Sequence, residues 1–149
     1  MKIWVDADAT PRPVKDILFR AADRVHIELL LVANQTLHTP RSQWISSVVV
    51  GRGFDVADEY IADKVESGDL VITADVPLAA AAVEKGATVI GPRGDVTDAT
   101  NARQRLAARN RNEERRLSGE MLGGPKAYSD RDKRKFAGSL DRWLAKARR

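Results

Sequence analysis

The stretch Leu70-Val-Ile-Thr-Ala-Asp-Val-Pro77 decides the fold. Its first four residues lack the polar alternation of a half-exposed strand, which indicates a strand buried on both faces of a parallel sheet. Pro77 suits the first turn of a helix, and Asp75 stands where the strand gives way to that helix. The stretch therefore predicts a strand-to-helix unit with an acid at the carboxyl end of the strand.

The same pattern recurs on both sides of this stretch. The expected strands cover residues 2–5, 27–32, 48–50, 70–73 and 88–90. The expected helices run from the prolines after Asp8 to about residue 24, and over 54–65 and 78–85. Alternation of strand and helix predicts an α/β fold of three layers, with a mostly parallel sheet and helices on both faces.

After Gly94 the sequence becomes helical and rich in arginine. We expect helices over 97–117 and 129–147, with a turn or mobile lid at Gly123-Gly-Pro-Lys126 between them. Ser129-Asp-Arg-Asp132 resembles a capping box in which Asp replaces the usual Glu. No repeat or long linker interrupts the chain, so we expect one domain over 1–149, with 95–149 as its basic helical extension.

The charge of the chain is uneven. Residues 93–149 carry 16 basic and 8 acidic side chains, a net of +8, whereas residues 1–92 carry 9 and 13, a net of −4. Two interpretations remain open for the basic part: a solvated helical surface that keeps the protein soluble, or a surface that follows the phosphates of a nucleic acid.

Composition excludes several classes of protein. The chain has no cysteine, which excludes disulfide frameworks, thiolate zinc sites and cysteine nucleophiles, so a metal would be held by oxygen or by the two histidines. His26 and His38 show no partner pattern and are expected to be structural or exposed. There is no 18-residue apolar run and no signal-peptide pattern, so we expect a cytoplasmic protein without a membrane partner.

Five aspartates carry the candidate chemistry. Asp6 and Asp8 leave the first strand, Asp55 and Asp58 begin a helix at spacing i, i+3, and Asp75 leaves the fourth strand. The carboxyl ends of parallel strands meet at one edge of a sheet, where ligands bind. Carboxylates brought together there repel each other unless they are protonated or neutralised by a cation. All-oxygen ligation favours Mg²⁺ or Mn²⁺.

Helix capping is the alternative explanation for these acids. Asp55 and Asp75 stand at N-cap positions, Asp58 suits a first helical turn, and Asp6 or Asp8 could cap the helix after the first strand. Five acids at one edge of the sheet are more than helix caps require. Asp6 and Asp75 are the firmest candidates for metal ligands. Three further acids are expected in solvated or turn positions: Glu59, Asp63 and Asp69.

Other side chains could reach the same edge. Asn34 follows the second strand and Thr73 precedes Asp75 by two residues, so both could support the acids, although loop and strand roles remain open. Arg12, Lys15 and Arg93 are expected near this edge, either as phosphate contacts or as plain surface charge.

Several motifs resemble the YaiI/YqxD family of bacterial proteins, whose function is uncharacterised. The motifs, in order, are Trp4-Val-Asp-Ala-Asp-Ala-Thr-Pro11, Val32-Ala-Asn-Gln35, Gly53-Phe-Asp-Val-Ala-Asp58, Gly68-Asp-Leu-Val-Ile-Thr-Ala-Asp-Val-Pro-Leu-Ala79, Pro92-Arg-Gly94 and Gly123-Gly-Pro125. The resemblance spans nearly the whole chain. Where the family usually has cysteine, residue 10 is threonine, so a role for that cysteine is not required here.

The order of the aspartates is also similar, more distantly, to PIN and NYN nuclease domains. That resemblance implies a PIN-like fold, Mg²⁺ or Mn²⁺ held by Asp6, by Asp55 or Asp58, and by Asp75, and cleavage of RNA. PIN domains often have a further acid shortly after the last of these, where this chain has Val76 and Pro77. Asp8 is the candidate replacement.

These observations favour metal-dependent hydrolysis of phosphodiesters at Asp6, Asp8, Asp55, Asp58 and Asp75, with Asp6, Asp8, Asp58 and Asp75 as the expected metal ligands. In this mechanism the ion activates a bound water and the basic helices contact the nucleic-acid backbone. Two alternatives remain: a small-molecule phosphatase with Asp6 as nucleophile, although no suitable downstream lysine is evident, and a non-catalytic module that binds nucleic acid or protein.

Overall fold

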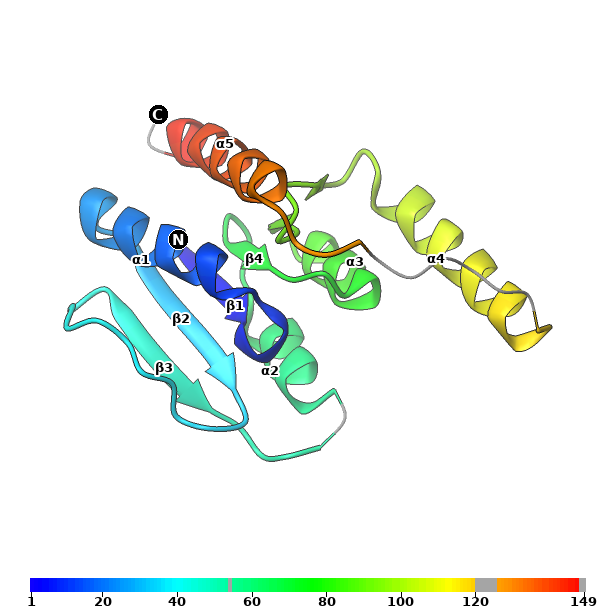
Figure 1. Cartoon of the computed structure of the whole chain (residues 1–149), viewed down its shortest axis with the longest axis horizontal. Coiled ribbons are helices and arrows are strands. Elements are labelled where there is room, and N and C mark those ends of the chain that lie inside the picture. Colours follow the sequence, from blue (N-terminus) through cyan, green and yellow to red (C-terminus); the bar gives the residue numbers. More distant parts are fainter. Residues whose placement is uncertain (54, 120–125, 148–149) are drawn as a thin grey trace.

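The computed structural model describes residues 1–53, 55–119 and 126–147, and its centre is a six-stranded sheet (Figure 1). The strand order is β3-β2-β1-β4-β5-β6. The strands are β1 (Lys2–Asp6), β2 (Glu28–Ala33), β3 (Ile45–Val49), β4 (Leu70–Ile72), β5 (Thr88–Ile90) and β6 (Val96–Thr97). The first five run parallel to their neighbours, and β6 pairs with β5 in the antiparallel direction. The expected mostly parallel sheet is confirmed.

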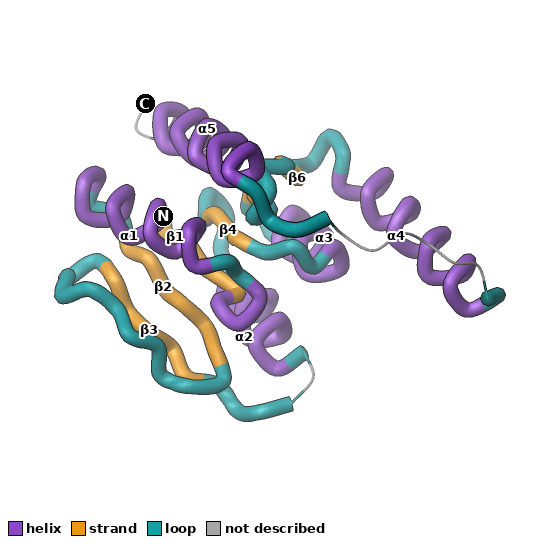
Figure 2. Tube along the Cα trace, in the orientation of Figure 1, coloured by secondary structure: helices purple, strands orange, loops and turns teal. Residues whose placement is uncertain are grey.

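Helices cover both faces of this sheet. The covering helices are α1 (Arg12–Val25), α2 (Val56–Lys64), α3 (Val76–Glu84) and α5 (Asp130–Ala147). Helix α4 (Ala102–Leu117) contacts α3, and a 3-10 turn, Ala7–Ala9, follows β1. One buried apolar cluster joins the sheet to α1 and α5, and a second joins it to α2 and α3. Along β1, Ile3 and Val5 belong to the first cluster and Trp4 to the second, because side chains alternate between faces. The three-layer α/β class is therefore confirmed (Figure 2).

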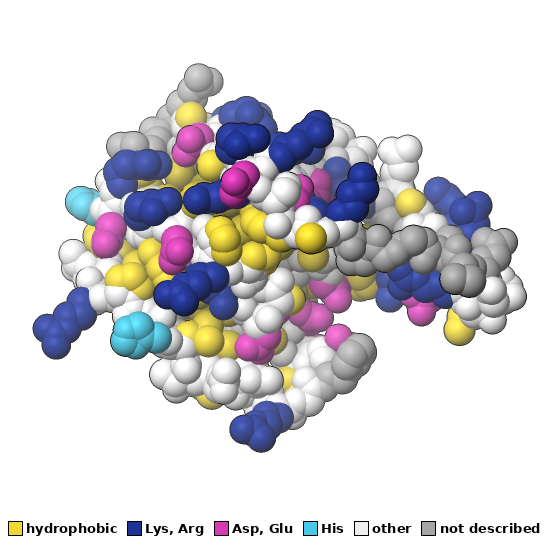
Figure 3. Space-filling view, in the orientation of Figure 1, with side chains coloured by type: hydrophobic (Ala, Val, Ile, Leu, Met, Phe, Trp, Pro, Cys, Tyr) yellow, Lys and Arg dark blue, Asp and Glu magenta, His cyan; other side chains and the backbone are white. Residues whose placement is uncertain are grey.

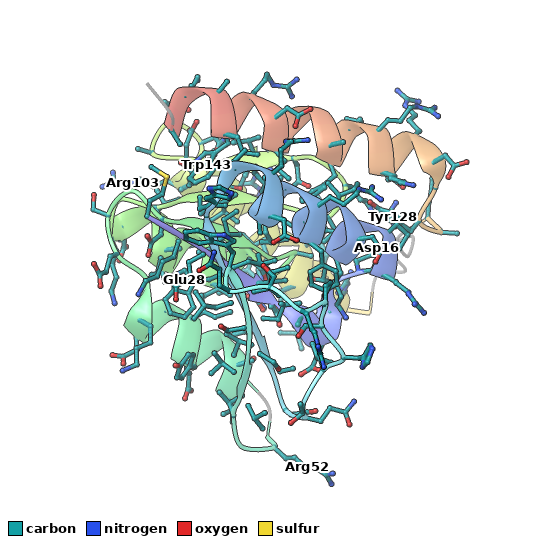
Figure 4. The ribbon with its side chains drawn as sticks, turned by 90° about the vertical axis from the view of Figure 1, so that its left-hand side faces the viewer. Asp16, Glu28, Arg52, Arg103, Tyr128 and Trp143 are labelled. Carbon is teal, nitrogen blue, oxygen red and sulfur yellow. The ribbon has the colours of Figure 1, made fainter. Side chains whose placement is uncertain are left out.

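The start of α5 follows the expected capping box. Ser129 Oγ accepts from the Asp132 N–H at 3.3 Å, and Asp132 Oδ2 accepts from the Ser129 N–H at 3.0 Å. Both hydrogen bonds of the capping box are therefore made, with Asp132 in the position usually held by glutamate. Farther along, Phe136 is fully buried, and Trp143 packs on the side of α5 that faces the first apolar cluster (Figure 4).

The start of the basic extension, residues 95–149, differs from the helix that the sequence predicted. A helix from residue 97 was expected, but Val96 and Thr97 pair with β5 as β6, and α4 begins only at Ala102. Asp98 makes the turn between them, because its Oδ1 accepts from both the N–H and the hydroxyl of Thr100. A local side-chain turn of this kind competes with helix.

The edge strand β3 is longer than expected, beginning at Ile45 instead of residue 48. Ser46 and Ser47 interrupt the apolar pattern, yet they pair with Leu30 and Leu31 of β2. Backbone pairing at a half-exposed edge needs no apolar side chain, so periodicity alone misses these residues.

Asp69 was expected in a solvated or turn position, and it is a turn residue whose side chain is buried. Its carboxylate accepts from the Lys2 N–H at 2.9 Å, the Trp4 indole N–H at 3.0 Å and the Glu66 N–H at 2.9 Å. Asp69 thus fastens the start of β1 to the turn before β4.

Two sequence expectations fall outside the part of the chain that the structure describes: the turn at Gly123-Gly-Pro125, and Phe54 at the expected start of the second helix. Within the described part, no helix combines the length and the apolar character needed to cross a membrane.

Candidate metal centre

The register of β1 and β4 places Asp6 at the carboxyl edge of the sheet. Val5 of β1 pairs with Ile72 of β4, so Asp6 lies beside Thr73 just past the end of β4. Thr73 Oγ1 donates to Asp6 Oδ2 at 3.1 Å and accepts from the Asp75 N–H at 3.0 Å. Thr73 is buried and connects two of the expected acids by these hydrogen bonds, and its supporting role stays a prediction.

Three carboxylates, including that of Asp75, lie close together. Asp55, Asp58 and Asp75 each offer one carboxylate oxygen, and these oxygens lie within 4.8 Å of one another. The three residues line a cavity of about 320 Å³, together with Glu59, Ala62, Pro77, Leu78, Ala81 and Arg109. Figure 3 shows acidic side chains over α2 and between α2 and α4. Asp6 and Asp8 fall outside this group of three.

Helix capping accounts for only one of these acids. Asp75 is the N-cap of α3, and its Oδ1 accepts from the Leu78 N–H at 2.8 Å. Asp55 occupies the N-cap position of α2 with a left-handed backbone (φ 64°), but its side chain makes no capping bond. Neither Asp6 nor Asp8 caps α1, which begins after Pro11. Asp58 lies in the first turn of α2, where an anion was expected. Helix ends therefore explain Asp75 and Asp58 but not the other acids.

Two carboxyls at this site, those of Asp58 and Asp6, have raised pKa values. Burial, together with the negative charges of Asp6, Asp75 and Asp55, raises the pKa of Asp58 to about 7. Burial also raises the pKa of Asp6 above its usual range, opposed in part by the hydrogen bond from Thr73. Burial and the neighbouring negative charges both disfavour the ionised form of Asp58, so it keeps its proton to a higher pH than an ordinary carboxyl does.

This raised pKa predicts how stability depends on pH without metal. The folded pKa of Asp58 exceeds its ordinary value of 3.8, so its contribution is fully present below about pH 4 and is lost as the pH rises through 7. In EDTA, we expect the melting temperature to fall between pH 4 and pH 7, and less so in Asp58→Asn. Asp63→Asn, an exposed position on the same helix, is the control. Equal slopes in Asp58→Asn and wild type would contradict the assignment.

Asp8, an expected metal ligand, and Asn34, an expected supporting residue, contact each other at the end of the neighbouring strand β2. Asp8 is exposed, and its Oδ2 accepts from the backbone N–H of Asn34 at 3.0 Å. Asn34 thus acts through its main chain and fixes the turn after β1 against the end of β2.

The basic candidates lie elsewhere. Arg12 and Lys15 line a different cavity of about 480 Å³, between α1 and the chain after β2. Arg93 pairs with Asp132 at 2.8 Å and donates to the Lys126 carbonyl, so it ties the β5–β6 connection to the start of α5. None of the three is among the described residues that line the aspartate cavity.

Arg109 of α4 is the residue of this cavity that the sequence did not reveal. It lies 34 residues after Asp75 in the chain, in a helix whose only sequence signal was its overall basic charge. Helix α4 contacts α3, and this packing brings one arginine to a cavity lined by acids.

Comparison with known proteins identifies the relatives of this chain. Residues 4–146 match the family model described as "Uncharacterized BCR, YaiI/YqxD family". A UPF0178 protein of Shewanella sp. (strain MR-7) is 56% identical over 148 residues, covering 99% of this chain and 97% of the relative. UPF0178 proteins of Hahella chejuensis and Dechloromonas aromatica are 56% and 51% identical, each over 98% of this chain and 97% of the relative. No solved structure gives a significant match. The chain belongs to the YaiI/YqxD family.

Proposed function

We propose that the protein is a metal-dependent phosphodiesterase that hydrolyses nucleic acid, with RNA as the favoured substrate, at the aspartate cavity. The observation that carries the proposal is that carboxylate oxygens of Asp55, Asp58 and Asp75 lie within 4.8 Å of one another. The buried Asp6 is connected to Asp75 through Thr73. The preference for RNA rests on the resemblance to PIN and NYN domains.

The donor set fits a hard divalent cation. All three meeting side chains offer carboxylate oxygen, the ligand type that Mg²⁺ and Mn²⁺ prefer. Asp55, Asp58 and Asp75 would hold the ion, and its positive charge would offset the burial and the carboxylate repulsion that raise the pKa of Asp58. When bound, such an ion supplies Lewis acidity and lowers the pKa of a coordinated water.

Residues around the acids have two roles in this proposal: some orient the carboxylates, and one binds the phosphate. The Leu78 N–H orients the Asp75 carboxylate, and Thr73 orients both Asp6 and the Asp75 main chain. Thr73 is therefore a positioning residue. Arg109, on the wall of the same cavity, offers a guanidinium to an anionic phosphate, which it can bind with two parallel hydrogen bonds. The acids hold the metal and do not attack covalently.

Thermal melts with and without metal test the premise. A ligand that binds only the folded state at about 100 times its Kd stabilises by about 2.7 kcal/mol. For a chain of this size, that corresponds to a rise in melting temperature of roughly 5–10 °C. We expect Mn²⁺ and Mg²⁺ to produce this rise in wild type and a smaller one in Asp58→Asn. An unchanged wild-type melting temperature at millimolar Mn²⁺ would refute the metal site.

Cleavage of a labelled single-stranded RNA, in Mn²⁺ and in EDTA, tests the reaction. Products that form only with metal, and without a phosphorylated protein intermediate, support the proposal. Trapping of a phospho-aspartate on Asp6 would indicate the phosphatase instead. Binding of RNA without turnover in either condition would indicate a non-catalytic module.

A further inference from the structure

Among the residues that the structure describes, few cover helix α4. Of its 16 residues only Ala102 is buried, and Leu117 at its end is 81% exposed. Figure 1 shows α4 extending away from the sheet, with α3 beside its first turns. A helix with so little apolar burial gains little stability from packing, so its exposed length is available to a partner.

The charge on α4 defines the chemistry of that partner. The helix carries six arginines and two glutamates, a net charge of +4. A cavity of about 440 Å³ lies along it, lined by Val76, Arg105, Ala108, Arg109, Asn112, Glu113 and Arg116. Its cationic groups are guanidiniums, which suit phosphate oxygens better than lysine does. A polyanion complements this surface.

Arg109 joins this groove to the aspartate cavity. The same side chain lines both, so the basic groove along α4 leads directly to Asp55, Asp58 and Asp75. Arg105 and Arg116 lie on the groove 4 residues before and 7 residues after Arg109, spacings that keep side chains on one face of a helix. The distance from Arg105 to Arg116 is about 16 Å along the axis, at about 1.5 Å per residue.

We infer that α4 is the surface along which a single-stranded nucleic acid binds, with its phosphates on Arg109 and Arg116 and its backbone leading into the aspartate cavity. This inference rests on the proposed function and specifies its substrate as a polynucleotide strand. The aspartate cavity, at about 320 Å³, has the size of a small-molecule site. A flexible strand can bend one phosphodiester into such a cavity, whereas a duplex, with a persistence length of about 150 base pairs, resists that bend.

Binding in EDTA tests this inference apart from the metal and from cleavage. The probe is a fluorescein-labelled single-stranded RNA of about 12 nucleotides, within the range of single-strand site sizes. Anisotropy titrations over a series of salt concentrations give the slope of log K against log salt, about −0.7 per neutralised phosphate. Arg109→Ala/Arg116→Ala should bind more weakly, with a slope shallower by about 1.4.

The matched control is Arg131→Ala/Arg134→Ala, which removes the same charge from exposed positions on α5. We expect it to bind with the wild-type slope. Arg109 and Arg116 are exposed, so both double variants should melt like wild type.

Three outcomes would overturn the inference: a wild-type slope in the α4 variant, an equal loss in the α5 control, or no salt-dependent binding of RNA at all, which would leave α4 to a protein partner. Tighter binding of a duplex of the same length would overturn the single-strand assignment. If RNA bound through α4 but metal did not change the melting temperature, the proposed phosphodiesterase would be refuted, whereas the inference that α4 binds a nucleic-acid strand would still hold.

Discussion

Asp75→Asn is expected to lose metal-dependent cleavage by more than about 100-fold, the upper end of what loss of an outer-shell partner costs. Asparagine keeps the oxygen that caps α3 at the Leu78 N–H, but it removes the negative charge that would hold the ion. The measurement is cleavage of labelled single-stranded RNA in Mn²⁺, with melts of the same protein in EDTA. Without metal, the variant should melt at or above the wild-type temperature, because carboxylate repulsion is relieved.

Two further variants separate the proposed metal role of Asp75 from its capping role. Asp75→Ala loses both, so its metal-free form should be less stable by roughly 0.5–2 kcal/mol, the usual cost of a lost cap. Asp63→Asn removes a charge from an exposed position on α2 and should cleave like wild type. If Asp75→Asn retained metal-dependent cleavage, or if it were as destabilised as Asp75→Ala while metal left wild type unchanged, Asp75 would be only a cap.

Phe136→Ala should reduce the free energy of unfolding by about 3–5 kcal/mol, the range for truncating a buried aromatic residue. Phe136 is 0% exposed and belongs to the same apolar cluster as Ile3 and Val5 of β1. Urea denaturation should show a lower midpoint, a single transition and an unchanged slope. This outcome would support the expectation that residues 95–149 extend the same domain.

Leu117→Ala is the control for this truncation, because Leu117 is 81% exposed on α4. Its effect should stay within about 0.5 kcal/mol. A second transition, or a main transition that Phe136→Ala does not move, would show that α5 unfolds separately from the sheet.

Local patterns in the sequence were sufficient for the α/β class and most of its elements. The apolar runs ending at Asp6 and near Asp75 are strands β1 and β4, and the capping box at Ser129 is present as expected. These signals depend on residues within a few positions of each other, so no knowledge of the packing is needed to interpret them. The same reasoning failed at β6 and at the start of β3, where pairing with a neighbouring strand decides the conformation.

For the candidate site, the sequence alone supplied the acids, and only the tertiary structure decided how they meet. Parallel strands with helical crossovers put the ends of β1 and β4 at one edge, so Asp6 and Asp75 could be placed near each other in advance. Tertiary structure decides which three acids lie closest: Asp55, Asp58 and Asp75. The link from Asp6 to Thr73 depends on the register of β1 and β4. The position of Arg109 depends on the packing of α4 against α3. Those are contacts between residues distant in the chain, and no short-range pattern encodes them, because side-chain periodicity fixes a face of an element and not its neighbour.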